Sequence, residues 1–175
     1  MSLLVAEIAS PIGPLVLATT EGPRPRVAAL TFGDAWERLR PRLADRTGTD
    51  PAAWRAARAT GDPARRLRDY FAGDLAALDA IEVDTGGTPF QRSVWKALRR
   101  IGPGRTASYA DVARRIGNPR AVRAVGLANG ANPVCVIVPC HRVIASGGGL
   151  GGYGGGLERK RWLLAHEGAL PDGHD

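Results

Sequence analysis

Residues 108–129, SYADVARRIGNPRAVRAVGLAN, decide the fold of the second half of this chain. Ser108 followed by Asp111 is a helix-starting pattern, and it predicts a helix over 109–116. The Asn-Pro pair that comes next predicts the start of another helix, over 118–129. Two short helices joined by a tight turn that contains glycine are typical of a helix-turn-helix.

The second of these helices is predicted to have an inward face and a solvent-exposed face. Val122 and Val125 are expected to face inward, and Arg120 and Arg123 to face solvent. Many of its other residues have small side chains, which would allow the helix to approach nucleic acid or a neighbouring helix closely. These residues are Ala121, Ala124, Gly126 and Ala128. An ordinary helical hairpin within a core is therefore an alternative to a DNA-binding element.

The chain before residue 108 predicts an α/β protein of two domains. Strands are expected over 3–9, 15–20 and 27–32 as an antiparallel meander, with helices over 35–44 and 63–71 and a short strand over 81–83. The breaker Thr-Gly-Gly at 85–87 places a domain boundary after residue 84. A further helix begins at Thr88-Pro89, with Phe90, Val94, Leu98 and Ile101 on one face.

Charge is distributed unevenly between the two halves. Residues 1–84 carry 11 Arg and 12 acidic residues, a balance of −1, whereas residues 85–175 carry 13 Arg or Lys and 5 acidic residues, a balance of +8. An acidic partner such as nucleic acid is expected for the second half. No apolar run approaches the roughly 18 residues that span a membrane, and residues 1–13 have no basic signal-peptide start. We therefore expect a soluble, cytoplasmic protein that does not associate with membranes.

The run Pro139-Cys140-His141-Arg142-Val143 is the candidate for chemistry. The apolar residues 134–138 predict a buried strand that ends at the proline, and a glycine-crowded segment, 147–156, follows. Because strand ends beside glycine loops often carry function, the cysteine is expected to be reactive. Burial in the core is the common fate of a free cysteine and remains the alternative.

A reactive cysteine needs a base and a group that orients the base. The ordinary pKa of a thiol, about 8.5, leaves little thiolate at neutral pH. We expect His141 to act on Cys140, either across a bend at Pro139 or through a bridging water, and Glu167 to orient the imidazole from the end of a helix over 157–167. Taken singly, His141 could be a surface imidazole and Glu167 a helix-end charge.

The two cysteines, Cys135 and Cys140, are expected to remain unbridged. On one extended segment they would lie roughly 16 Å apart at about 3.3 Å per residue, beyond the reach of a disulfide, which needs Cα atoms within about 7 Å. The Cys-x4-Cys-His spacing does not suit zinc, and neither Cys nor His occurs before residue 135. No metal site is predicted.

Over residues 88–168 the chain resembles the O6-alkylguanine-DNA alkyltransferases, also called methylated-DNA–protein-cysteine methyltransferases. The matching runs, in order, are FQ at 90–91, VW at 94–95, SY at 108–109, IGNP at 116–119, RAVG at 123–126, NP at 132–133, PCHRVI at 139–144, GY at 152–153, Lys160 and LL at 163–164. Residues 1–84 match loosely, through SPIGPL at 10–15 and YF at 70–71. The resemblance implies a ribonuclease H-like domain over 1–84 and a DNA-binding, alkyl-acceptor domain over 85–175, with a helix-turn-helix and a short active-site strand.

The resemblance also implies an activity, which is direct DNA repair. Cys140 would take the alkyl group from O6-alkylguanine, and also from O4-alkylthymine, and keep it as a thioether, so that each molecule acts once and needs no cofactor. His141, through a water and oriented by Glu167, would draw off the thiol proton. Asn132 would fix the turn that presents the cysteine, and Tyr109 would donate to guanine N3 and offset the charge on the leaving base.

The implied partner is double-stranded DNA, bound by a monomer in the minor groove. Arg123 would fill the space left by a base that is rotated out of the duplex, and the residues beside it would line the DNA: Arg120, Ala121, Ala124 and Gly126. The flipped base would lie against Tyr109, Val143, Tyr153, Gly154 and Gly155. Binding of this kind would depend little on DNA sequence and strongly on salt.

Two departures from the family pattern affect loops only. The run Ile101-Gly102-Pro103-Gly104 replaces the usual Ile-Pro-x-Gly, and Gly154 stands where some members have a hydroxyl residue. The absence of early Cys and His excludes the N-terminal zinc site of some relatives.

Three other functions compete with alkyl transfer. A lesion sensor that flips damaged guanine without chemistry is disfavoured, because such proteins lack the nucleophile that Cys140 provides. A thiol hydrolase using Cys140, His141 and Glu167 would turn over repeatedly. A helix-turn-helix regulator would prefer one DNA sequence.

Overall fold

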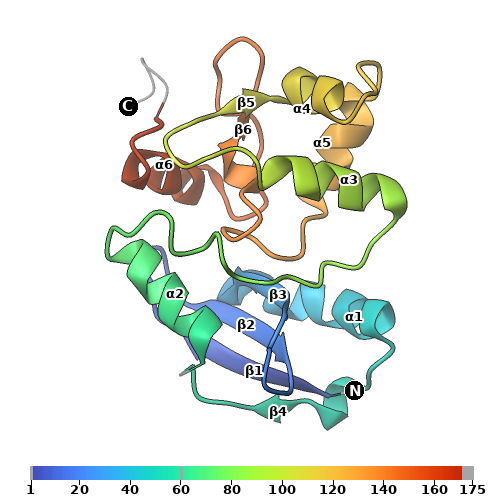
Figure 1. Ribbon diagram of the computed structural model, residues 1–175, viewed down its shortest axis with the longest axis vertical. Helices are drawn as coiled ribbons and strands as arrows, with labels where there is room; N and C mark the ends of the chain where they lie inside the picture. Colours follow the sequence, from blue (N-terminus) through green and yellow to red (C-terminus); the bar gives the residue numbers. More distant parts are fainter. Residues whose placement is uncertain (1, 60, 171–175) are drawn as a thin grey trace. The chain divides into compact units, whose positions relative to one another are not determined.

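The computed structural model describes residues 2–59 and 61–170 and has two compact units, Met1–Gly86 and Gly87–Asp175 (Figure 1). All the predicted site residues belong to the second unit. No helix within the described ranges is both long and apolar enough to cross a membrane.

The first unit is built on a four-stranded sheet of order β3-β2-β1-β4. Strands β1 (Leu3–Ile8), β2 (Leu15–Thr20) and β3 (Val27–Phe32) are antiparallel, as the sequence predicted. Strand β4 (Arg55–Ala56) runs parallel to β1 and was not predicted, because two exposed residues carry no alternating pattern. The predicted strand over 81–83 is reduced to a single bridge between Val83 and Val27. The likeness to ribonuclease H stays a prediction.

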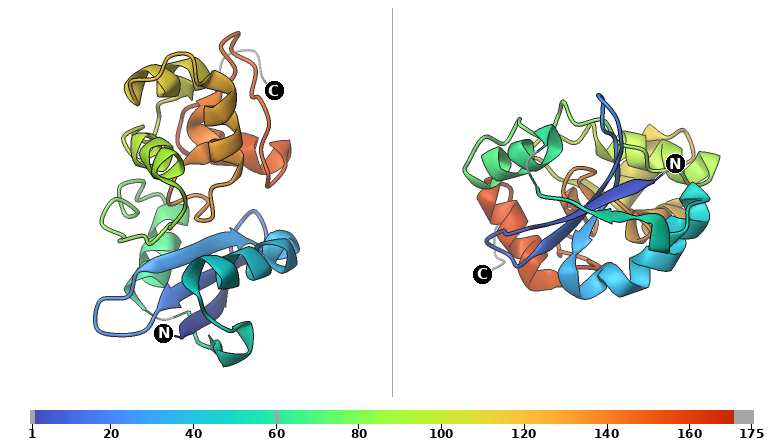
Figure 2. Two further views of the ribbon diagram at one scale, coloured as in Figure 1. Left: turned by 90° about the vertical axis from the view of Figure 1, so that its right-hand side faces the viewer. Right: turned by 90° about the horizontal axis from the view of Figure 1, so that it is seen from below.

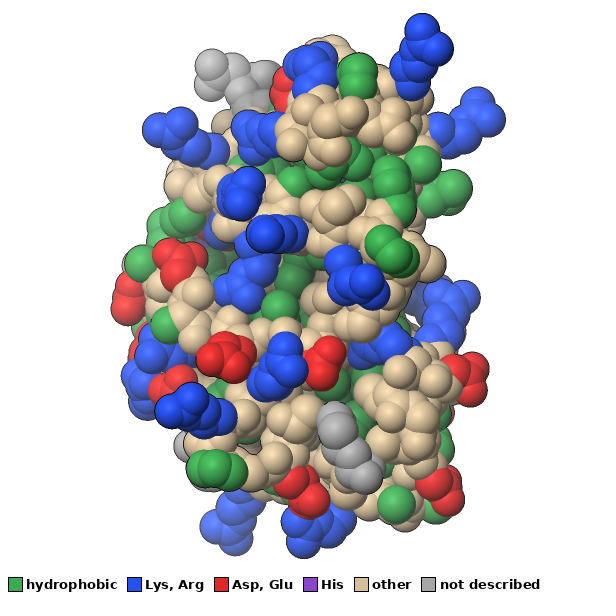
Figure 3. Space-filling view, turned by 45° about the vertical axis from the view of Figure 1, so that its right-hand side comes forward, with side chains coloured by type: hydrophobic (Ala, Val, Ile, Leu, Met, Phe, Trp, Pro, Cys, Tyr) green, Lys and Arg blue, Asp and Glu red, His purple; other side chains and the backbone are tan. Residues whose placement is uncertain are grey.

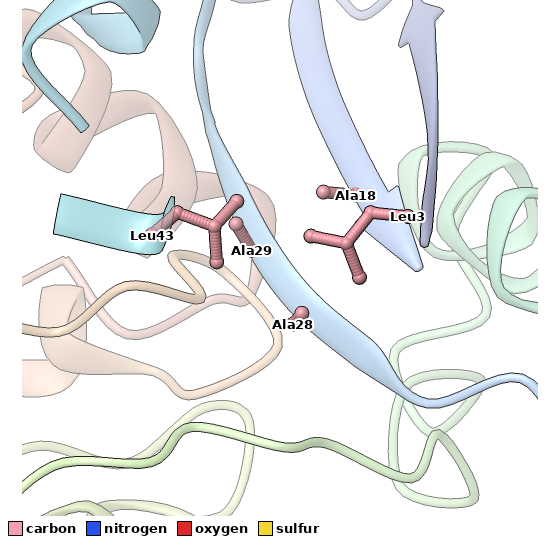
Figure 4. Close-up of a cluster of buried hydrophobic side chains, with 5 residues drawn as sticks. All are labelled: Leu3, Ala18, Ala28, Ala29 and Leu43. Carbon is pink, nitrogen blue, oxygen red and sulfur yellow. The ribbon is translucent and has the colours of Figure 1, made fainter. Parts of the chain in front are cut away.

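Helices and short 3-10 turns complete this unit. They are η1 (Gly33–Ala35), α1 (Trp36–Thr47), η2 (Pro51–Ala53) and α2 (Asp62–Phe71). Helix α1 packs against β3 (Figure 2). Figure 4 shows part of the resulting core, a cluster of buried side chains from the sheet and from α1: Leu3, Ala18, Ala28, Ala29 and Leu43. The mixed α/β architecture of the prediction is therefore correct.

The second unit contains four α-helices among the described residues, and their starts follow the sequence signals closely. They are α3 (Pro89–Leu98), α4 (Tyr109–Arg115), α5 (Val122–Gly130) and α6 (Leu157–His166). Thr88 and Ser108 each form a capping box, in which the side chains of the cap and of the third helical residue bond each other's main-chain amides. Trp95 Nε1 of α3 donates to Ala128 O of α5 at 2.8 Å and joins the two helices.

Helix α5 begins later than predicted. Residues 118–121 form a turn, in which the Ala121 amide donates to Asn118 O at 3.0 Å, and the helix starts at Val122. The expectation that Val122 faces inward is wrong, since its side chain is 38% exposed; Val125 is buried as expected. Helices α4 and α5 do pack together, but their role as a DNA-binding helix-turn-helix stays a prediction.

The strand predicted over 134–138 is wrong. These residues are largely buried, as the apolar run indicated, but they form consecutive turns, and Cys140 opens a 3-10 turn, η3 (Cys140–Arg142). The strand of this region comes after the cysteine: β6 (Val143–Ile144) pairs in parallel with β5 (Ala107–Ser108), directly before α4. Burial explains the apolar run, so its composition could not distinguish a strand from buried turns.

Candidate active site

The turn that carries Cys140 is held by the side chain of Asn132. Its Nδ2 donates to Val138 O at 2.8 Å, and its Oδ1 accepts from the Val134 amide at 3.0 Å. The Val138 amide in turn donates to Val134 O at 3.0 Å. One buried amide side chain thus forms the hydrogen bonds that main-chain groups at both ends of this loop require. In a β-strand, the neighbouring strand would have supplied them.

Two tight three-residue turns fold this loop back on itself. In the first, Val136 has φ of +70°, and the Ile137 amide donates to Cys135 O at 2.8 Å. In the second, Pro139 has φ −82° and ψ 66°, and the Cys140 amide donates to Val138 O at 2.8 Å. Both match γ-turn geometry, and the form with positive φ is the rarer and more strained of the two.

Because of these turns, the separation predicted for the two cysteines is wrong. Cys135 and Cys140 lie close enough for each thiol to shift the pKa of the other, and both cysteines are free. The Cys135 thiol is the largest cause of the lowered pKa of Cys140; burial opposes it, and the Asn132 amide and the Lys160 ammonium group add to it. The pKa of Cys135 is raised by Cys140 and by burial. Cys140 is therefore the thiol that ionises more readily.

His141 lies next to Cys140 in sequence and is fully buried. Its Nε2 lies 2.9 Å from Glu167 Oε1. Burial lowers the pKa of His141, with partial opposition from Glu167, so the imidazole is neutral at neutral pH. Nδ1 is buried and has no hydrogen-bond partner among the described residues.

Glu167 also binds Arg142, which makes it the centre of a buried charged network. Arg142 Nε donates to Oε2 at 2.9 Å and Nη2 to Oε1 at 2.8 Å, and its Nη1 donates to Ile101 O. Burial alone would raise the pKa of Glu167, but the hydrogen bonds from His141 and Arg142 together lower it to about 2. The carboxylate is thus ionised at any physiological pH.

Lys160 of α6 brings a buried positive charge to the site. It is fully buried, and its Nζ donates to Val143 O at 2.7 Å and to Gly152 O at 3.1 Å. Burial lowers the pKa of Lys160 to about 8, and the negative charge of Cys140 opposes this. The ammonium group therefore ties β6 to the glycine segment and favours the Cys140 thiolate.

Tyr109 lies at the start of α4, between two glycines. A Cβ on Gly126 of α5 would lie 3.9 Å from the tyrosine ring, and one on Gly151 would lie 3.2 Å from its hydroxyl oxygen. Gly151 also has φ of +70°, so glycine suits this position in both respects. Burial, and then the charge of Cys140, raises the pKa of Tyr109, so the phenol stays protonated.

The remaining predicted residues are near the site or on the surface. Val143 is buried and pairs with Ala107, whereas Tyr153 and Gly155 are partly buried and Gly154 is exposed. Arg120 and Arg123 are exposed, in the turn before α5 and in its first turn. Figure 3 shows that arginine and lysine side chains are spread over the visible surface. Ala124 is exposed, and Ala121 and Gly126 are partly buried.

Three residues of this arrangement were not assigned a role from the sequence: Cys135, Arg142 and Lys160. Arg142 follows the Cys-His pair, and Lys160 lies one helical turn before Leu163 and Leu164, so the sequence offered a reason to consider both residues. Cys135 could not have been found, because its role depends on turns that the sequence did not predict. Within the described residues, no group of three or more His, Cys, Asp or Glu could hold a metal ion.

Comparison with known proteins gives consistent matches. Residues 89–169 match the family described as the DNA-binding domain of 6-O-methylguanine DNA methyltransferase. The methylated-DNA–protein-cysteine methyltransferase of Salmonella typhimurium is 46% identical over 174 residues, which cover 97% of this chain and 98% of that protein.

Solved structures agree with the sequence match. The crystal structure of Mycobacterium tuberculosis O6-methylguanine methyltransferase has a TM-score of 0.77 and 41% identity, covering 98% of this chain and 96% of that one. The crystal structure of Mycobacterium tuberculosis OGT in complex with DNA has a TM-score of 0.76 and 40% identity, covering 97% and 96%.

Proposed function

Because the chain belongs to the family of methylated-DNA–protein-cysteine methyltransferases, we propose that Cys140 is the cysteine that receives the alkyl group. The chain repairs DNA directly, by alkyl transfer to a protein cysteine. The observation that carries the proposal is the environment of Cys140, whose pKa is lowered by Cys135, Asn132 and Lys160. Cys135, whose pKa is raised, is the poorer nucleophile.

His141 removes the proton from Cys140 through a water molecule. The ionised Glu167 accepts a hydrogen bond from Nε2–H, which leaves the lone pair of the neutral imidazole on Nδ1. This is the nitrogen without a partner among the described residues, so it is the one that can accept a proton. Arg142 holds Glu167 and thereby keeps the imidazole in this tautomer.

The transfer itself is a direct displacement. The Cys140 thiolate attacks the alkyl carbon of O6-alkylguanine, the S–C bond forms as the C–O6 bond breaks, and negative charge passes to the guanine ring. Tyr109 offsets that charge by donating from its phenol to N3, which its raised pKa permits. The thioether is stable, so one molecule repairs one lesion without a cofactor. O4-alkylthymine offers the same reacting group.

The base is held between η3, β6 and the glycine segment. The carbonyl oxygens of Cys140 and Val143 accept from its exocyclic amine, and the amides of Gly154 and Gly155 approach O6. Val143 O already accepts from Lys160, and a carbonyl oxygen has a second lone pair for the base. Tyr153 completes the pocket.

The partner is double-stranded DNA, which a monomer binds through α5 in the minor groove. Arg123 enters the stack in place of the flipped base, while Arg120 contacts phosphate and the small residues Ala121, Ala124 and Gly126 allow close approach. Flipping costs a few kcal/mol, and Arg123 is exposed at the start of α5, where it is available to offset this cost.

The assignment of Cys140 is tested by comparing two matched serine variants. A duplex containing O6-methylguanine is mixed with the parent, Cys140→Ser and Cys135→Ser, and methyl transfer is followed by the mass of the intact protein. Cys140→Ser should gain no methyl group, whereas Cys135→Ser should still gain one, more slowly. Methylation of Cys140→Ser at the parent rate would show that the acceptor is a different residue.

A further inference from the structure

Cys135 is a second thiol in the site, and alkyl transfer gives it no covalent role. It lies with Cys140 on the folded loop that Asn132 closes, near enough for the two thiols to shift each other's pKa, and it is the only other cysteine of the sequence. Its Sγ also lies 4.0 Å from Asn132 O, a long contact that leaves the side chain weakly held. Cys140 is 4% exposed, while Cys135 is partly exposed.

The backbone between the two cysteines folds back on itself, which keeps both cysteines on one short loop. Residues 135–139 lie in turns and are outside every helix and strand. Val136 holds a positive φ, a conformation that a β-branched residue adopts only under strain. The two thiols are near enough to shift each other's pKa, and a disulfide, with its S–S length of about 2 Å, requires the sulfurs to approach further.

We propose that Cys135 is a resolving thiol, which captures oxidised Cys140 in an internal disulfide when the protein meets hydrogen peroxide or an organic hydroperoxide. The proposal rests on the proposed function only for its consequence, that the disulfide withdraws the alkyl acceptor reversibly. In a reducing compartment such a disulfide is transient, and cellular thiols return both cysteines to the active form.

The chemistry balances in two steps. The Cys140 thiolate attacks one peroxide oxygen, the O–O bond breaks, and the departing hydroxide takes a proton, leaving Cys140 as a sulfenic acid. The sulfur of Cys135 then loses its proton and attacks the sulfur of Cys140, the S–O bond breaks, and the oxygen leaves as water. The two sulfurs together lose two electrons, and hydrogen peroxide is reduced to two waters. With an organic hydroperoxide, an alkoxide departs in place of hydroxide, and the products are one alcohol and one water.

Disulfide formation protects Cys140 because the competing reaction, further oxidation of the sulfenic acid, is irreversible. A sulfenic acid that meets no thiol is oxidised further to the sulfinic acid, which ordinary thiols do not reduce. The features that favour the Cys140 thiolate, Lys160 and the hydrogen bonds, also make it sensitive to peroxide. A neighbouring thiol therefore preserves a site that can be used only once.

The experiment compares the parent with Cys135→Ser, which keeps a hydroxyl but cannot form a disulfide. Both proteins are treated with hydrogen peroxide, and intact mass and peptide mapping are recorded before and after dithiothreitol. The parent should lose two hydrogens, yield a peptide linking residues 135 and 140, and regain most of its methyl acceptance after reduction. Cys135→Ser should gain two or more oxygens on Cys140 and, after dithiothreitol, should recover less than about a tenth of its methyl acceptance.

Oxidation of Cys140 to the sulfinic acid in the parent, at the same rate as in Cys135→Ser, would overturn the proposal. Equal recovery of the two proteins after dithiothreitol would do the same. The mass of the disulfide form does not depend on DNA repair, so a failure of the proposed function is distinguishable: it would appear as a missing methyl adduct before any oxidant is added.

Discussion

At the scale of single residues, the site depends on charges buried around one sulfur atom. Lys160 is fully buried, donates to Val143 and Gly152, and lowers the pKa of Cys140. Glu167 is kept ionised by His141 and Arg142. A buried charge is tolerated when it is paired and hydrogen-bonded, and both Lys160 and Glu167 have such partners in the site.

Replacing Lys160 with Met should raise the pKa of Cys140, because the nearby positive charge is lost. At neutral pH the reaction with free O6-benzylguanine should slow by on the order of tenfold, because a smaller fraction of Cys140 is then thiolate. The rate is measured from pH 6 to 10, with Lys96→Met, an exposed lysine of α3, as the matched control. Coincident pH profiles for the parent and Lys160→Met would exclude this role.

Glu167 should make the protein sensitive to acid. Its pKa falls from an ordinary 4.5 to about 2 on folding, so its contribution to stability is present above pH 4.5 and is lost as the pH falls toward 2. The difference corresponds to about 3 kcal/mol. Urea unfolding at a series of pH values should show this loss in the parent and in Glu158→Gln, an exposed carboxylate of α6, but not in Glu167→Gln.

At the scale of elements, the sequence predicted helices better than the active-site turn. Helices α3 and α4 begin directly after their caps, Thr88 and Ser108, as expected, because a capping box is a local signal that lies within a few residues. The loop that carries Cys140 was predicted as a strand, because its shape is set by Asn132 and by a positive φ at Val136. The amino-acid composition of an apolar run does not determine such a turn.

The same difference explains which site contacts were foreseen. Glu167 was expected beside His141 from its place at the end of the last helix, and Nε2 of His141 lies 2.9 Å from Oε1 of Glu167. The contact between Cys135 and Cys140 follows from the turn alone, and an extended segment would have excluded it. Predictions failed where tertiary hydrogen bonds, rather than sequence spacing, decide the backbone.

Helix α5 is the element expected to act on duplex DNA, and Arg123→Ala tests this. If the substitution removes about 1.4 kcal/mol of free energy that stabilises the flipped-out base, repair slows about tenfold. We expect at least this loss on a duplex with O6-methylguanine and an unchanged rate with free O6-benzylguanine. Arg24→Ala, an equal change of charge in the first unit, should affect neither rate. Equal losses on both substrates would remove Arg123 from base flipping.

At the scale of the whole molecule, charge and chemistry coincide in one unit. The balance of +8 over residues 85–175 falls entirely within Gly87–Asp175, the unit that also holds Cys140 and every residue proposed to act with it. A basic surface attracts any DNA, which suits a protein that must search for lesions regardless of sequence. The proposed chemistry, in contrast, uses one thiol, that of Cys140, and uses it once.

The most direct test of the account is the number of methyl groups that each protein molecule removes. The protein is mixed with an excess of duplex containing O6-methylguanine, the lesion that remains is quantified over time, and the methylated residue is mapped. We predict that loss of the lesion stops at one equivalent per molecule and that the methyl group is found on Cys140. Continued turnover, or a methyl group on Cys135, would contradict the account.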